Sequence, residues 1–333
     1  MSDKPLASVS VSLDNLWTYL KTQGDPGWES RPSFFDIFLP RVLEVLDVAG
    51  VRATFFVVGR DAERDENAEM IRDVAGRGHE VGNHSFEHEP WLHRYTRDQL
   101  EEDLERAEDA ITRVTGQRPV GYRGPDYSWS PVLLELLGRR GYLYDASALP
   151  TYLGPLARAY WLRTTRLDAA ERAIRSDLFG NFRDGRRPVK PFWWLLGEGK
   201  VLLEIPITTF PGIKTPVHLN YLLYLSRYSE RAALAYFRLA ITACRLTGTE
   251  LSFVLHPLDL LGSDEVPMLA SFPGMDLPGE RKRSVLLKTL ALLTDSFSLV
   301  TMRTHAEALQ ARWGLYVLHP GSLTRPGSLP TAP

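Results

Sequence analysis

Segments of strand type alternate with segments of helical type along most of this 333-residue chain, and the alternation limits the folds it can adopt. Residues 7–13 and 52–58 are expected to be strands, and residues 34–49 between them carry apolar side chains at helical spacing and end at Gly50. The Gly-, Pro- and aromatic-rich stretch Trp17–Pro32 is expected to be a loop. The further expected elements are helices 66–77, 96–115, 130–140, 229–247, 280–295 and 304–312 and strands 80–82, 120–123, 142–145, 203–206, 250–255 and 298–301. This order predicts a parallel sheet or barrel.

Charge and cysteine content exclude several classes of protein. A net charge of −2 gives no reason to expect a nucleic-acid partner. Cys244 is the single cysteine, so an intrachain disulfide is impossible, which fits a reducing compartment. The first residues lack the apolar core of a signal peptide, and no stretch reaches the roughly 18 apolar residues of a membrane span. We therefore expect a cytoplasmic protein.

His84 and His88 lie four residues apart, directly after the short apolar run 80–82. Side chains at this spacing converge on one point, either on one face of a helix or in a tight turn. Two imidazoles with one carboxylate suit zinc or another borderline divalent ion, and in parallel α/β folds the chemistry collects beyond the strand ends. The alternative is two surface histidines that happen to have this spacing.

Five short motifs follow one another in the chain: Ser12–Asn15, His84-Ser85-x-x-His88, Arg123–Tyr127, Tyr144–Ser147 and Leu255–Pro257. In this order and spacing they resemble the motifs of the polysaccharide deacetylases, a family related to chitin, peptidoglycan and nodulation-factor deacetylases. The resemblance implies a distorted (β/α) barrel, which we expect over residues 1–314. We interpret residues 150–215 as an aromatic and basic insertion and residues 315–333 as a flexible tail.

The resemblance also implies the chemistry of the site. It implies a divalent metal ion, expected to be zinc, on Asp14, His84 and His88, and hydrolysis of an N-acyl amide. Arg123 would orient a carboxylate that acts with the metal, and the alternative is a surface arginine. His256 would protonate the leaving amine, and the alternative is a buried histidine satisfied by a backbone carbonyl.

Four residues close to these motifs have two interpretations each. Asp145 is either the carboxylate partner of Arg123 or the cap of a turn. Asp259 either tunes the pKa of His256 or caps the next turn. Tyr127 and Trp129 either line the substrate groove or pack inside the protein. The histidines outside the motifs are expected to be structural or surface residues: His79, His93, His218 and His305.

The first motif holds one acidic residue, Asp14, where the family usually has a base and a ligand, either adjacent or separated by one residue. In the adjacent register Asp14 is the base and Asn15 takes the ligand position. In the spaced register Asp14 is the ligand and Ser12 takes the position of the base. A neutral amide is a poor ligand for a zinc-like ion, which favours the spaced register. The base is then absent or supplied from elsewhere, with Asp126 as the first candidate.

Aromatic residues interleave with arginines and lysines in residues 158–194. They are either the core of an inserted subdomain or a patch that contacts the inner face of the membrane.

We expect a metal-dependent enzyme that removes an N-acetyl or N-formyl group from an amino sugar in a glycan, glycolipid or lipid-linked precursor. Two alternatives stay open: a metal-independent hydrolase of a cyclic amide or ureide, and an inactive carbohydrate-binding member of the fold.

Overall fold

The computed structural model describes residues 4–156, 182, 184–312 and 314–320. Its strands are β1 (Leu6–Leu13), β2 (Thr54–Val57), β3 (Glu80–Asn83), β4 (Gly121–Tyr122), β5 (Tyr144–Asp145), β6 (Phe192–Leu195), β7 (Val201–Glu204), β8 (Leu251–Leu255), β9 (Ser298–Val300) and β10 (Tyr316–Leu318). They form one mostly parallel sheet in the order β10-β6-β7-β5-β4-β3-β2-β1-β8, and β9 also pairs with β1. The expected α/β fold of barrel type is confirmed, although among the described residues the path of strands stays open between β8 and β10.

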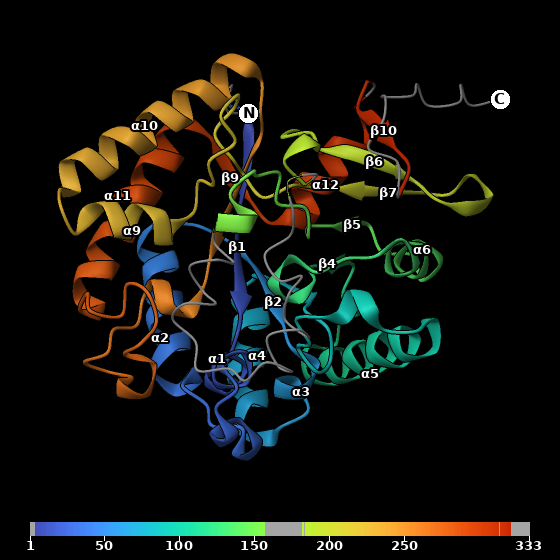
Figure 1. Cartoon of the computed structure of the whole chain (residues 1–333), viewed down its shortest axis with the longest axis horizontal. Coiled ribbons are helices and arrows are strands. Elements are labelled where there is room, and N and C mark those ends of the chain that lie inside the picture. The colour runs from blue at the N-terminus through green and yellow to red at the C-terminus, as the bar shows by residue number, and fades with distance from the viewer. Residues whose placement is uncertain (1–3, 157–181, 183, 313, 321–333) are drawn as a thin grey trace.

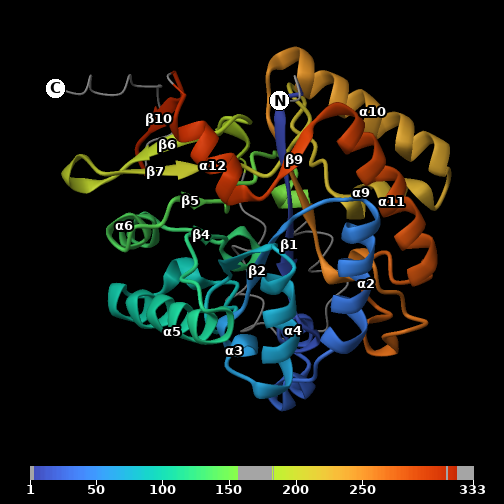
Figure 2. The ribbon, with the colours of Figure 1, turned by 180° about the vertical axis from the view of Figure 1, so that it is seen from behind.

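The helices cover this sheet on both flanks. They are α1 (Leu16–Gln23), α2 (Phe35–Val48), α3 (Gly59–Ala62), α4 (Asp65–Gly76), α5 (Arg97–Thr115), α6 (Pro131–Arg139), α9 (Leu219–Ser226), α10 (Glu230–Thr247), α11 (Gly279–Ser296) and α12 (Met302–Gln310). Figures 1 and 2 show α9, α10 and α11 together on one flank and α5 and α6 on the other. The central strands β1, β2 and β8 are almost fully buried, and their side chains form the main core. In the described residues, no helix combines the length and the apolar character that a membrane crossing requires.

The carboxyl ends of five strands lie in one row. The register pairs Leu13 with Val57, Val57 with Asn83, Asn83 with Tyr122 and Tyr122 with Asp145. These residues are the last of β1, β2, β3, β4 and β5. Whatever follows each strand is therefore delivered to the same edge of the sheet, where parallel α/β folds place their chemistry.

Helix α1 occupies a stretch that the sequence predicted to be a loop. The Asn15 side chain caps it by accepting from the Leu16 amide, and Gly24 ends it in the left-handed conformation. Trp17 and Leu20 are buried, so packing stabilises a segment whose glycines and prolines lie outside the helical turns. The loop prediction was wrong for residues 17–23 because Trp17 and Leu20 belong to the core.

The flexible tail was predicted to begin at residue 315. The structure instead has Tyr316–Leu318 as β10, which pairs in parallel with β6 through Val317 and Trp193. Val317 is buried between exposed Tyr316 and half-buried Leu318, the alternation of an edge strand. The remainder of the predicted tail, residues 321–333, lies outside the described residues.

The described part of the predicted insertion contains a hairpin of β6 and β7. Trp194 is buried, donates from Nε1 to Glu204 at 2.8 Å and stacks on Trp129 with ring centroids 5.4 Å apart. Trp193 is half-buried and packs against the cluster around Tyr144. These tryptophans therefore belong to the core. Residues 157–181 and 183, which carry most of the predicted membrane patch, lie outside the described residues.

Candidate metal centre

Asp14, His84 and His88 meet at the carboxyl edge of the sheet. Asp14 follows β1, and its Oδ1 lies 3.2 Å from His84 Nε2 and 3.0 Å from His88 Nε2. One donor atom from each of the three buried residues lies within 4.8 Å of the others. The spacing of the two histidines beyond a strand end predicted that their side chains converge, and the family resemblance implied Asp14 as the third ligand.

The histidine motif is a turn rather than a helix. Ser85 and His88 have left-handed φ angles of 63° and 48°, which are unfavourable for residues with a Cβ. The turn is held by two hydrogen bonds, from the Ser85 amide to Asn83 Oδ1 at 2.8 Å and from the His88 amide to Ser85 Oγ at 3.1 Å. Such strain persists only where the surroundings fix it, and here it directs both imidazoles to Asp14.

The geometry of the three donors fits a divalent ion. His84 Nδ1 donates to the Arg123 carbonyl at 2.6 Å, which leaves His84 Nε2 facing the Asp14 carboxylate. A lone pair and a carboxylate oxygen at this distance repel each other unless a proton or a metal cation lies between them. Two ligand atoms each about 2.1 Å from a tetrahedral ion lie roughly 3.4 Å apart, close to the separations found here. The site can therefore hold a divalent metal ion through one oxygen and two nitrogens.

Electrostatics support the ligand assignment. Burial alone would raise the pKa of Asp14, but His88 and His84 together bring it below its ordinary value. Burial lowers the pKa of His84, while Asp14 raises that of His88 against the effect of burial. Asp14 is thus an anion throughout the physiological range, as a metal ligand must be.

The neighbours of Asp14 bear on the choice between the two registers of the first motif. The Asn15 side chain turns away from the histidines and donates to Asp61 Oδ1 at 2.8 Å and to Ser33 Oγ at 3.0 Å. Ser12 lines the same cavity as Asp14. This placement agrees with the spaced register, in which Asp14 is the ligand and Ser12 stands where the family has a base.

Arg123 is fully buried under the site. Its guanidinium donates to the Ala146 carbonyl at 3.1 Å and to Ser12 Oγ at 3.4 Å, and lies 4.3 Å from the centroid of the Phe56 ring. Among the residues that the structure describes, it forms no ion pair. Burial lowers its pKa to about 10. The interpretation as a surface arginine is wrong, and the side chain that Arg123 meets is a serine instead of a carboxylate.

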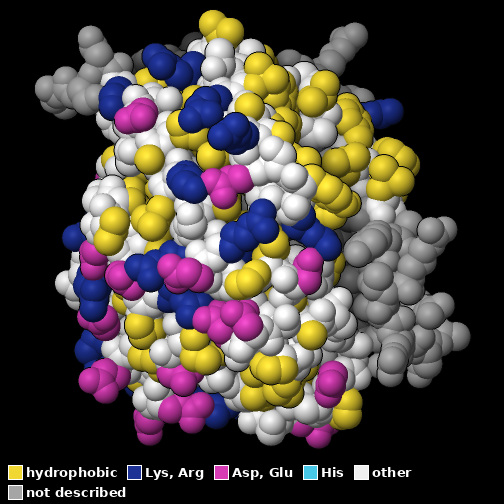
Figure 3. All heavy atoms as spheres, turned by 90° about the vertical axis from the view of Figure 1, so that its left-hand side faces the viewer, with side chains coloured by type: hydrophobic (Ala, Val, Ile, Leu, Met, Phe, Trp, Pro, Cys, Tyr) yellow, Lys and Arg dark blue, Asp and Glu magenta, His cyan; other side chains and the backbone are white. Residues whose placement is uncertain are grey.

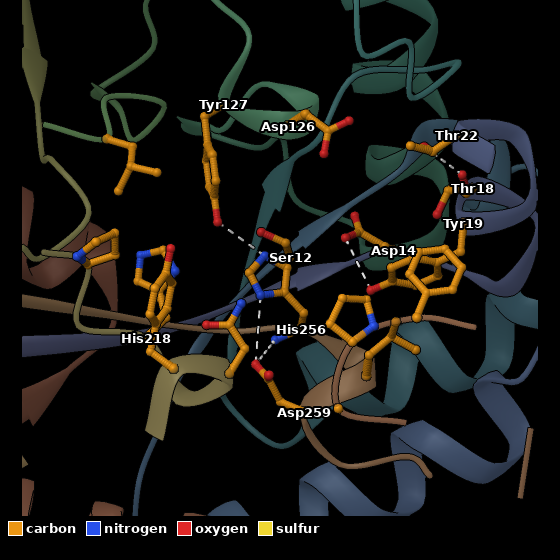
Figure 4. Close-up of a pocket in the computed structure, with 18 of the residues that line it drawn as sticks. Ser12, Asp14, Thr18, Tyr19, Thr22, Asp126, Tyr127, His218, His256 and Asp259 are labelled. Atoms are coloured by element: carbon orange, nitrogen blue, oxygen red, sulfur yellow. Dashed lines mark hydrogen bonds and ion pairs between the residues drawn. The ribbon is translucent and has the colours of Figure 1, made fainter. Parts of the chain in front are cut away.

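Asp126 projects into the cavity from an irregular turn. Asp126 and Tyr127 have left-handed φ angles of 46° and 62°, and a Cβ on Gly124 would lie 1.8 Å from the Ser128 carbonyl oxygen, so this turn requires glycine there. Figure 4 shows the Asp126 carboxylate above Asp14. Its Oδ2 is buried without a hydrogen-bond partner in the described part of the chain, and burial raises its pKa. A raised pKa makes this carboxylate a better proton acceptor than an exposed one.

His256 follows β8 and faces the cavity. Its Nδ1 lies 3.7 Å from Asp259 Oδ2, and its Nε2 lies 3.3 Å from the Tyr127 hydroxyl (Figure 4). Burial would lower the pKa of His256, but Asp259 raises it above its ordinary value. Asp259 also accepts from the His256 amide at 2.8 Å. Asp259 thus makes both of the contacts considered for it: it raises the pKa of His256 and it caps the turn that follows.

Asp145 and Trp129 lie outside the cavity wall. Asp145 Oδ1 accepts from the Ala146 amide at 2.9 Å and from Ser147 Oγ at 2.6 Å, which is a turn cap. Trp129 is covered by Trp194 and by Arg187, whose guanidinium lies 4.1 Å from its ring centroid. Packing on the insertion, which no motif reveals, takes Trp129 away from the substrate.

The cavity has a volume of about 390 Å³. Its polar lining comprises Ser12, Asp14, Thr18, Tyr19, Thr22, His84, His88, Asp126, Tyr127, Thr151, His218, Asn220, Tyr221, His256, Asp259 and Lys282. His218 was expected to be structural or on the surface, yet it is part of this wall. Three other histidines outside the motifs form hydrogen bonds elsewhere: His79 with the Ala53 amide, His93 with Ser128 and His305 with Ser8.

Comparison with known proteins relates this site to a family. Residues 26–144 match the family model described as polysaccharide deacetylase. The chain is 32% identical to a peptidoglycan deacetylase of Helicobacter pylori over 154 residues, which are 45% of this chain and 51% of the relative. It is 34% identical over 106 residues to a peptidoglycan-N-acetylmuramic acid deacetylase of Bacillus subtilis, covering 32% of this chain and 39% of the relative. The chain thus spans about half or less of these curated relatives.

A solved structure extends the similarity over the whole fold. A candidate polysaccharide deacetylase from Mycobacterium smegmatis superposes with a TM-score of 0.60 at 21% identity, covering 93% of this chain and 92% of that one. Fold and site define an α/β protein whose strand ends carry a His-His-Asp group that could hold a metal ion. Residues 26–144 are thus similar to the polysaccharide deacetylase family. Asp14 and His256 lie outside the matched residues 26–144, and the fold brings them to the site.

Proposed function

We propose that this protein is a metal-dependent hydrolase that removes an N-acetyl or N-formyl group from an amino sugar. The observation that carries the proposal is the convergence of Asp14, His84 and His88 on one point beside the cavity. The named relatives, which act on peptidoglycan, support an N-acetylated sugar as substrate. The donor set favours zinc, because two imidazoles and a carboxylate suit a borderline ion.

The reaction requires that water adds to the amide carbonyl, that the C–N bond breaks and that the leaving amine gains a proton. A bound divalent ion would polarise the carbonyl and lower the pKa of water. His256, whose pKa Asp259 raises, is the proton donor to the amine. Asp126 is the acceptor of the proton from water, since its Oδ2 is buried and unpaired in the described residues. Tyr127 holds His256 Nε2 at 3.3 Å on the cavity side.

Ser12 is the specific observation that favours an inactive, sugar-binding protein instead. It occupies the cavity position nearest to Arg123, where the family usually has a base. Under that alternative the metal centre and cavity would bind a sugar without turning it over. A metal-independent hydrolase of a cyclic amide or ureide is the other alternative.

Elemental analysis coupled to acetate and formate release from a panel of N-acyl amino sugars tests the proposal. We expect bound divalent metal, and activity that a chelator abolishes and added metal restores. Protein that is active without metal would indicate the metal-independent hydrolase of a cyclic amide or ureide. Protein that is inactive but still binds sugars would indicate the inactive, sugar-binding member of the fold. The cytoplasmic location and the membrane contact through residues 158–194 stay predictions.

A further inference from the structure

The outer face of helix α10 carries an ordered set of basic and apolar side chains. The inner face packs on the protein through Ala233, Phe237, Ala240, Ile241 and Cys244. On the opposite side, the exposed residues are Arg231, Ala232, Ala235, Arg238, Leu239, Thr242, Arg245 and Leu246. Leu239 is 59% exposed and Leu246 is 83% exposed. Packing of α10 on the protein therefore does not explain why leucines lie on its outer face.

The spacing of these residues aligns them in two rows. Arg231, Arg238 and Arg245 follow one another at seven-residue intervals. Successive members of such a series lie only about 20° apart around the helix axis, so they form one row along the helix. At about 1.5 Å per residue the row is about 21 Å long. Ala232, Leu239 and Leu246 form a second row with the same spacing beside the first. A cationic row and an apolar row thus run side by side along the exposed face.

The arginines of this row have no carboxylate partner among the residues that the structure describes. Basic residues close to α10 do have one: Arg227 pairs with Asp276, Arg283 with Glu44 and Lys288 with Glu230. Glu230 is the one acidic residue of α10, and its pairing with Lys288 directs it to α11. The charge of the arginine row is therefore available to an anionic partner.

Positive charge continues beyond the end of α10. Gly248 is the C-cap of the helix, and a Cβ on it would lie 3.7 Å from Lys190 Nζ. Figure 3 shows the flank that carries α10: Lys and Arg side chains gather on its upper part beside hydrophobic ones, and acidic side chains are concentrated lower down. The upper part of this flank thus combines positive charge with apolar surface.

A second copy of the chain is a poor partner for this face. The less charged positions of the face recur at the three- and four-residue steps of a coiled-coil seam: Ala232, Ala235, Leu239, Thr242 and Leu246. In an antiparallel pair of such helices, each arginine row would face the arginine row of the other copy. In a parallel pair, each row would face Tyr236 and Ala243. Neither arrangement supplies a carboxylate to the arginines.

An anionic bilayer supplies what the face lacks. Phosphate oxygens of lipid headgroups accept paired hydrogen bonds from guanidinium groups, and leucines beside them can enter the boundary between headgroups and acyl chains. The apolar stem of an arginine lies along apolar surface while its charged end reaches the headgroups. Figures 1 and 2 show α10 at the outer edge of the molecule, where a fluid bilayer can adapt to a protruding helix.

We propose that the outer face of α10, with its arginine row and its alanine–leucine row, is a docking surface for an anionic lipid bilayer. This surface differs from the stretch 158–194, in which the sequence predicted a membrane contact. The inference goes beyond the proposed function and does not depend on it.

Cosedimentation of the purified protein with lipid vesicles tests the docking surface. We expect binding to vesicles of phosphatidylglycerol at low salt and little binding to vesicles of phosphatidylcholine. About 1 M NaCl should release most of the protein, because it shortens the Debye length from about 10 Å at 0.1 M to about 3 Å. Equal binding to both kinds of vesicle would overturn the proposal.

Two sets of substitutions on α10 examine the two rows. Arg231→Gln, Arg238→Gln and Arg245→Gln together should weaken binding to phosphatidylglycerol about 100-fold, because each arginine near such a surface contributes roughly fivefold. Leu239→Ser with Leu246→Ser should weaken it about tenfold or more, because less apolar area is buried. Circular dichroism shows whether each variant keeps the wild-type fold.

The matched control removes the same charge from other exposed positions. Arg72→Gln, Arg113→Gln and Lys200→Gln together alter α4, α5 and the residue before β7. This variant should bind phosphatidylglycerol within about twofold of the wild type, since the overall charge contributes less than the charge at the contact surface. A loss as large as that of the α10 arginine variant would overturn the proposal, because net charge alone would then explain the binding.

The remaining outcomes also decide. Absence of binding at low salt, or binding that survives loss of the arginine row, would overturn the docking surface. A dimer in solution that the arginine substitutions dissociate, without any binding to vesicles, would overturn it as well and assign the face to a second copy. Acetate release from a soluble N-acetyl amino sugar should be the same in the α10 variants and the wild type. Failure of the proposed function would therefore leave the vesicle result intact.

Discussion

Introducing a carboxylate beside Arg123, as Ser12→Asp, should increase turnover. Arg123 is fully buried, and the side chain it meets in the cavity wall is Ser12, at 3.4 Å. A serine accepts no proton near neutral pH, whereas a carboxylate there would be oriented by the guanidinium and exposed to the cavity. The substitution would thus restore the base that the spaced register lacks.

The magnitude follows from the burial of Arg123. The change of its pKa from 12.5 to about 10 corresponds to roughly 3 kcal/mol, at about 1.4 kcal/mol per pKa unit. A new ion pair between the introduced carboxylate and Arg123 would recover part of the free energy that burial of the guanidinium costs. Desolvation of the new carboxylate opposes this gain, so the free energy of unfolding should change by about 1 kcal/mol or less. A positioned base contributes about 10²–10⁴ in rate. If Asp126 acts as the base proposed above, part of this rate factor is already present, and we expect kcat to rise roughly 10- to 100-fold.

Steady-state acetate release by the wild type, Ser12→Asp and Ser12→Asn measures this gain. Ser12→Asn is the matched control, since the asparagine side chain has nearly the size of aspartate but carries no basic oxygen. We expect a gain in kcat only for the carboxylate, with KM and metal content close to the wild type. Folded, metal-loaded Ser12→Asp with unchanged kcat would refute the spaced register.

Three further predictions concern the other site residues. His84→Ala and His88→Ala should each lose most of the bound divalent ion but keep the wild-type circular dichroism, and full metal occupancy in both would contradict the ligand assignment. His256→Ala should lower kcat about 10²- to 10⁴-fold with little loss of metal. As the acid, His256 acts in its protonated form, and Asp259 raises its pKa, so activity should fall as the pH rises above that pKa. Asp259→Asn should move this fall to lower pH. An alkaline limb of the pH profile that stays in place in Asp259→Asn would argue against His256 as the acid. Asp126→Asn should lower kcat about 10²-fold and retain metal, and near-normal turnover would exclude Asp126 as the base.

The sequence predicted those parts of the site that local order determines. His84 and His88 lie four residues apart just after a strand, and parallel strands bring their carboxyl ends to one edge. Asp14 as their partner was implied by the family resemblance, and the register of β1, β2 and β3 explains why it meets both histidines. The same rule predicted the α/β fold from the order of its elements.

Contacts between distant segments were beyond the reach of the sequence. Trp129 lies near a motif, but its ring stacks on Trp194 of the β6–β7 hairpin. No periodicity in the sequence indicates this hairpin. His218 belongs to no motif, and only the fold shows that it lines the cavity. Helix α1 was missed because glycine and proline around it outweighed the cap formed by Asn15. In each case tertiary packing decided what local propensity could not.

The metal content of Asp14→Asn tests the central claim most directly. Asp14 is the one carboxylate in the His-His-Asp centre, at 3.0 and 3.2 Å from the two imidazoles. The wild type, Asp14→Asn and the control Asp126→Asn are purified in parallel with added zinc and measured by elemental analysis. We predict about one divalent ion per chain in the wild type and the control, and a small fraction of that in Asp14→Asn. Full occupancy in Asp14→Asn would contradict Asp14 as a ligand and with it the account of the site.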